Sequence, residues 1–196
     1  MVTGSGRADW VGSLQTYQQA FADGRLDAYR NRRWRQSQEF AGWLDEQNIP
    51  SLTAEQSQAI YRASGGRKTK EFTAIPMEEV RDSLDFLLFD TLGLEKRFDE
   101  SASIEGAYNL AGSGKEFVSY VLCVRDPGLF ALWSAHGERA LRKLGIYPKD
   151  LNKGNLGLGY MDLLEAMNVV RGRTGLSDFR AVDEFAYSVT KKSTGV

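Results

Sequence analysis

The chain has 196 residues, of which 42% are hydrophobic and 26% charged, and its formal net charge is −1. These values are ordinary for a globular protein, and no window approaches the roughly 18 consecutive apolar residues that a membrane-spanning helix needs. One cysteine and one histidine, Cys123 and His136, exclude an internal disulfide and leave too few ligands for an ordinary zinc site. We therefore expect a cytoplasmic protein without metal or cofactor.

The first part of the chain is predicted to be a short lead followed by helices. Residues 1–7 are expected to be a disordered lead, and residues 8–63 an N-terminal helical region. Pro50 ends one helix because proline cannot extend it, and Thr53 with Gln56 forms a capping-box pattern that opens the next. The helical spacing of apolar residues predicts helices over Trp10–Phe21, Leu26–Gln47 and Thr53–Tyr61.

A glycine-rich basic segment follows. Residues 64–75 include Ser64-Gly65-Gly66-Arg67-Lys68-Thr69 and are predicted to be a linker. A second helical domain is expected over 76–192, and Pro76 suits the start of its first helix. The helices predicted here are Pro76–Leu88, Leu94–Phe98, Ile104–Leu110, Glu116–Val124, Phe130–Leu144, Tyr160–Val170 and Phe179–Thr190. Because alternating strand patterns are nearly absent, the predicted fold class is all-α, a multi-helix orthogonal bundle.

Basic residues gather in one stretch. Residues 25–70 contain nine basic and five acidic side chains, a net charge of +4, which leaves −5 over the rest of the chain. Arg30 and Arg33 share one side of a predicted helix, and guanidinium groups suit phosphate contacts. The alternative is an ordinary solvated face with Trp34 packed in the core. The candidate phosphate contacts of this stretch are Arg30, Arg33, Arg67, Lys68 and Lys70.

One segment, Leu110–Leu122, suggests a mechanism. Gly112 and Gly114 are one residue apart, which allows a sharp turn, and the next helix begins with backbone N–H groups that have no partner within it. Those N–H groups and the helix dipole favour a phosphate, to which Lys115 adds a charged contact. We therefore predict DNA-backbone contacts at Gly112, Ser113, Gly114 and Lys115.

This pattern resembles the helix–hairpin–helix motif of DNA repair proteins, including the glycosylase superfamily built around it. Downstream, Asp126-Pro127, Trp133 and Glu138-Arg139-Ala140-Leu141 are similar to non-catalytic helical domains attached to bacterial restriction systems. The resemblance covers residues 76–190 and implies a bundle containing a helix–hairpin–helix element. Ser113 departs from the family, which usually has an aliphatic residue there, and a plain helix–helix turn remains the alternative.

The same resemblance implies that glycosylase chemistry is missing. Lyase-type members place a catalytic lysine second after the second glycine, where this chain has Glu116, and Lys115 comes one residue too early. They place a catalytic aspartate further along, where this chain has Trp133-Ser134-Ala135-His136. We therefore expect no catalytic residue.

The sequence thus predicts a non-catalytic DNA-binding module of a genome-defence or DNA-processing system. It would bind the phosphate backbone of duplex DNA, alone or within a larger restriction or defence assembly. We expect no membrane partner. Two alternatives stay open. One is a protein–protein interaction adaptor that docks through the N-terminal aromatic and arginine-rich helices. The other is a divergent DNA glycosylase, which would need a carboxylate from elsewhere to reach the hairpin.

Overall fold

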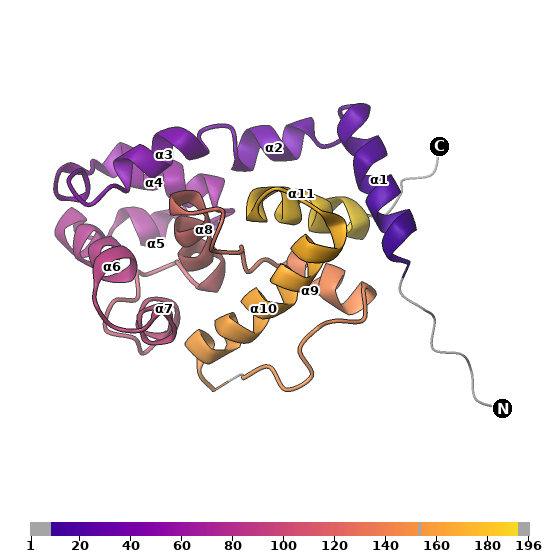
Figure 1. Ribbon diagram of the computed structural model, residues 1–196. Coiled ribbons are helices and arrows are strands. Elements are labelled where there is room, and N and C mark those ends of the chain that lie inside the picture. Colours follow the sequence, from indigo (N-terminus) through magenta and orange to yellow (C-terminus); the bar gives the residue numbers. More distant parts are fainter. Residues whose placement is uncertain (1–8, 153, 192–196) are drawn as a thin grey trace.

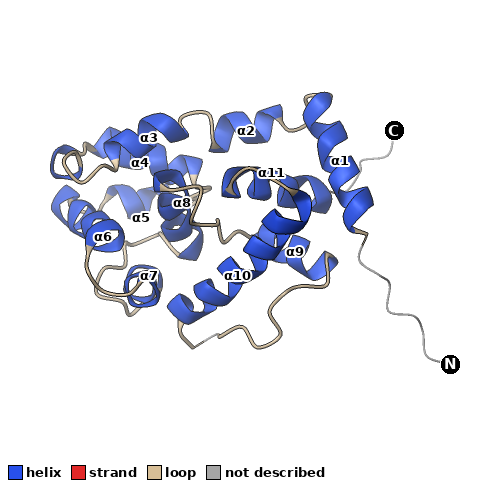
Figure 2. Cartoon of the chain, viewed as in Figure 1, coloured by secondary structure: helices blue, strands red, loops and turns tan. Residues whose placement is uncertain are grey.

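The computed structural model describes residues 9–152 and 154–191, so the lead predicted over residues 1–7 lies outside the described residues. Every regular element in the described part of the chain is a helix, as Figures 1 and 2 show, and the all-α class is confirmed. The helices are α1 (Trp10–Ala22), α2 (Asp27–Arg33), α3 (Ser37–Trp43), η1 (Ile49–Ser51), α4 (Ala54–Ala63), α5 (Thr69–Thr73), α6 (Met77–Phe89), α7 (Leu94–Ala102), α8 (Lys115–Arg125), α9 (Ala135–Lys143), α10 (Leu156–Thr174) and α11 (Phe179–Thr190). None of the described helices is long and apolar enough to cross a membrane.

The central element of the bundle is α8. All eight residues from Phe117 to Val124 are buried, and α8 packs against α3 and α7. In Figure 1 it lies between the N-terminal helices and the group formed by α9, α10 and α11. One buried cluster includes residues on both sides of segment 64–75, and α1 packs on α11, where the rings of Tyr17 and Phe185 lie 5.9 Å apart. The segment itself contains α5.

The prediction of one helix over Leu26–Gln47 is wrong, because a turn at residues 34–36 separates α2 from α3. The side chain of Trp34 is buried: its Nε1 donates to Asp183 Oδ2 at 3.0 Å, and its ring stacks on Tyr120 with centroids 5.2 Å apart. These contacts with distant parts of the chain fix the turn. The capping box of Thr53 and Gln56 is confirmed at the start of α4.

The helix predicted over Ile104–Leu110 is also absent, and this segment forms turns instead. Gly106 lies directly on the backbone of Glu100, and the Tyr108 N–H donates to the Glu100 carbonyl at 3.1 Å. The chain therefore folds back on the end of α7. The helix predicted from Phe130 begins only at Ala135, because the Ser134 hydroxyl accepts a hydrogen bond from the Gly137 N–H and caps it there.

Candidate functional site

Two glycine-containing loops meet at the start of α8. The loop after α4 and the turn before α8 line a groove of about 310 Å³, which we call the hairpin groove. Its lining residues are Tyr61, Ser64, Gly65, Gly66, Arg67, Lys68, Gly112, Ser113, Gly114, Lys115, Glu116 and Phe117. The fold thus places two regions that the sequence predicted separately, Arg67 with Lys68 and Gly112 to Lys115, around one groove.

The hydroxyl of Tyr61 joins the two loops. It donates to the Gly112 carbonyl at 2.7 Å and accepts from the Lys68 N–H at 3.0 Å. Gly66 lies against the Tyr61 ring, where a side chain would collide with it. Gly112 has a φ of +78°, and a Cβ there would stand 3.0 Å from the Lys68 carbonyl oxygen. Glycine is needed at this position for both its backbone angle and its close approach.

The N-terminus of α8 lacks a cap. Gly114 occupies the capping position and has no side chain to accept a hydrogen bond. The first backbone hydrogen bond of α8 runs from the Val118 N–H to the Gly114 carbonyl at 3.0 Å. Within the described residues, the N–H groups of Gly114, Lys115, Glu116 and Phe117 have no acceptor. Unpaired N–H groups at a helix start carry partial positive charge and favour an anion.

The cations of the groove come from the first loop. Arg67 and Lys68 are both exposed. Lys68 forms an exposed ion pair with Glu71 at 3.3 Å, and such a pair is weak enough to be exchanged for another anion. Lys70 is exposed on α5 but is outside the groove lining.

Lys115 makes an internal contact. Its Nζ lies 2.6 Å from Glu138 Oε1 on α9 and 4.3 Å from the centre of the Trp133 ring. Burial alone would raise the pKa of Glu138, but hydrogen bonds from Lys115, Trp133 and Arg142 hold it below its ordinary value. A carboxylate therefore does reach the hairpin lysine, and it holds that lysine in an ion pair.

Ser113 turns its side chain inward. Its Oγ is buried and has no hydrogen-bond partner in the described structure, and the same is true of Ser101 Oγ. Both residues line a small internal cavity of about 10 Å³ beside Leu84 and Leu87. The Ser113 N–H donates to the Leu110 carbonyl at 2.9 Å, so only the Ser113 carbonyl remains for a contact in the groove.

Arg30 and Arg33 do not line the hairpin groove. Arg30 pairs with Glu184 at 3.1 Å and lines a separate groove of about 580 Å³ formed by α1, α2 and α11. Arg33 is 5% exposed and donates to Glu116 Oε1 at 2.7 Å from beneath the groove. Arg30 is therefore in a partly exposed ion pair and Arg33 in a buried one, while Arg32 and Arg35 are exposed.

A buried polar network lies behind Arg33. Asp183 accepts hydrogen bonds from Tyr29 at 2.7 Å and Trp34 at 3.0 Å, and its Oδ1 lies 2.7 Å from His136 Nε2. The Tyr29 hydroxyl also accepts from Arg33 Nε at 3.2 Å. Burial would raise the pKa of Asp183, yet its contacts with His136, Arg33 and Tyr29 hold that pKa below its ordinary value. The network joins α2, α9 and α11.

Sequence reasoning missed two residues on which the groove depends. Tyr61 and Glu138 act through partners 51 and 23 residues away along the chain, and no local pattern marks them. Tyr61 was visible only as the end of a predicted helix beside a glycine pair. Glu138 was visible only as part of a downstream resemblance.

Across the described residues, no group of three or more His, Cys, Asp or Glu side chains is placed to hold a metal ion. Comparisons with protein-family models, with curated proteins and with solved structures give no match for this chain.

Proposed function

We propose that this protein is a non-catalytic DNA-binding module that grips the phosphate backbone in the hairpin groove. The observation that carries the proposal is the meeting of Arg67 and Lys68 with the uncapped N-terminus of α8. Backbone N–H groups and flexible cations together are the donors that phosphates bind in proteins. Duplex DNA is the chosen polyanion because the sequence of Leu110–Leu122 resembles the helix–hairpin–helix motif, although the segment before Gly112 forms turns in place of the first helix of that motif. A role in a restriction or other genome-defence assembly rests on that resemblance alone.

The roles of the predicted residues change within this proposal. Arg67, Lys68 and the N–H groups from Gly114 onward make the phosphate contacts. Lys115 contributes by balancing Glu138, which otherwise would place a negative charge beside the turn. Contacts of this kind position a protein on DNA and supply no sequence specificity.

The alternatives receive less support. An adaptor that docks through its arginine-rich helix has fewer free side chains than the sequence suggests, because Arg33 and Trp34 are buried and Arg30 is paired with Glu184, which leaves Arg32 and Arg35 exposed. A glycosylase of the lyase type needs a lysine side chain that is free to attack, whereas Lys115 is engaged by Glu138 at 2.6 Å. A protein that binds DNA without cleaving it fits both the arginine contacts and the contact of Lys115 with Glu138.

The proposal is tested by replacing both groove cations. We expect the double variant Arg67→Ala with Lys68→Ala to bind a labelled DNA duplex about tenfold more weakly, and equally so for unrelated sequences, because phosphate contacts are lost. Fluorescence anisotropy measures the affinity. The matched control is Arg139→Ala with Lys149→Ala, which removes two exposed cations outside the groove lining. Equal losses in the two double variants would contradict binding at the groove.

A further inference from the structure

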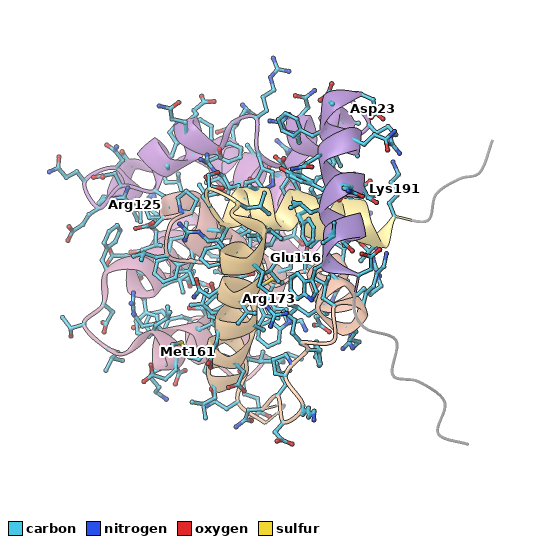
Figure 3. All side chains as sticks on the ribbon, turned by 45° about the vertical axis from the view of Figure 1, so that its right-hand side comes forward. Asp23, Glu116, Arg125, Met161, Arg173 and Lys191 are labelled. Atoms are coloured by element: carbon cyan, nitrogen blue, oxygen red, sulfur yellow. The ribbon has the colours of Figure 1, made fainter. Side chains whose placement is uncertain are left out.

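Arg33 contacts both loops that form the hairpin groove. Its Nη1 donates to the Ser64 carbonyl at 2.6 Å, at the start of the first loop. Its Nη2 donates to Glu116 Oε1 at 2.7 Å, in the first turn of α8. The guanidinium group therefore bridges the two sides of the groove. Glu116 is labelled in Figure 3.

The position of Arg33 is fixed independently of the groove. Its Nε donates to the Tyr29 hydroxyl at 3.2 Å, and that hydroxyl donates to Asp183. Its backbone carbonyl accepts from the Tyr120 hydroxyl at 2.6 Å. Because these partners are buried in the core, Arg33 holds one orientation beneath loops that are partly exposed.

Gly65 shows how closely the ion pair lies beneath the first loop. A Cβ on Gly65 would stand 3.4 Å from Glu116 Oε1 and 3.6 Å from Arg33 Nη2. The Glu116 carboxylate is thus held against the Gly65 backbone. It is kept there by a hydrogen bond to a guanidinium group whose side chain is only 6% exposed.

The charge of Glu116 matters because of its place in α8. It is the second residue of the helix, beside N–H groups that have no acceptor. A free carboxylate at this position would compete with a phosphate for those groups and repel it. Arg33 pairs with the carboxylate and fixes its position, while the charge of Glu116 remains close to the helix start.

We propose that Arg33 is a positioning residue of the hairpin groove, which holds the Glu116 carboxylate away from the α8 N–H groups and thereby sets the affinity for phosphate. This inference rests on the proposed DNA-binding function. Arg33 itself remains beneath the loops and touches no ligand. Glu116 is the regulatory charge, and Arg33 determines where that charge lies.

The test compares two substitutions at the same helix position. Glu116→Gln keeps an oxygen that accepts from Arg33 but removes the negative charge, so we expect duplex DNA to bind about fivefold more tightly, the size expected for one charge at a helix N-terminus. Glu55→Gln is the matched control, because Glu55 is the second residue of α4 and is exposed away from the groove. We expect it to leave the affinity within about twofold.

A second pair of variants separates positioning from folding. Arg33→Gln should weaken DNA binding by about fivefold, and adding Glu116→Gln should restore it, because the unpaired carboxylate is then gone. Circular dichroism checks that each variant is folded, and if Arg33→Gln unfolds, Arg33→Lys, which keeps the positive charge but lacks the fork that reaches both Ser64 and Glu116, takes its place. Weaker or unchanged binding by Glu116→Gln, with a wild-type chain that binds DNA, would overturn the role of Arg33 only. A folded wild-type chain that binds no DNA would overturn both proposals.

Discussion

Asp183 is a buried carboxylate on α11 whose partners come from α2, from the turn after α2 and from α9. Its folded pKa lies below the ordinary value of 3.8, so its contacts add stability above pH 3.8 and lose it as the pH falls toward the folded value. We expect Asp183→Asn to lower the free energy of unfolding at pH 7 by about 3 kcal/mol, because the change leaves a buried network incomplete. We also expect the difference from wild type to shrink below pH 3.8.

Urea unfolding followed by circular dichroism, at pH 7 and at several acidic pH values, measures both effects. Asp82→Asn is the control, because Asp82 is exposed on α6 and makes no ion pair in the described chain. A stability of Asp183→Asn equal to that of the control would show that the network contributes little.

At the scale of elements, the turn before α8 depends on Gly112. Alanine there must adopt a φ of +78° and also press on Lys68, whereas Gly145 has a φ of +71° with nothing within 4 Å of its missing Cβ. We expect Gly145→Ala to cost about 1 kcal/mol of stability through backbone strain alone. Gly112→Ala should cost more and also weaken DNA binding, since it displaces the loop that carries Lys68. Thermal unfolding and anisotropy together measure this difference, and equal behaviour of the two variants would exclude a special role for the turn.

Three segments of the chain show which elements a sequence can predict. The start of α4 was predicted correctly because Thr53 and Gln56 bond each other within one turn. The turn between α2 and α3 was missed because it depends on a hydrogen bond from Trp34 to Asp183, 149 residues away. The missing helix after α7 depends on Gly106 packing on the Glu100 backbone, a tertiary contact without a local pattern.

At the scale of the whole molecule, the net positive charge of one segment did not predict a single basic surface. Residues 25–70 carry a net charge of +4, yet the fold places Arg33 in the core, Arg30 in another groove, and only Arg67 and Lys68 at the hairpin. The sequence identified the glycine turn and the basic loop as separate features. Their meeting depends on Tyr61, which bonds a carbonyl 51 residues away.

The salt dependence of DNA binding tests the central claim most directly. Anisotropy titrations of the wild-type chain on a labelled duplex, from about 50 to about 200 mM salt, give the slope of log affinity against log salt. Phosphate contacts by Arg67 and Lys68 should give a slope of about −2 or steeper, independent of DNA sequence. The absence of binding at low salt, or an affinity that does not change with salt, would contradict a phosphate-gripping groove.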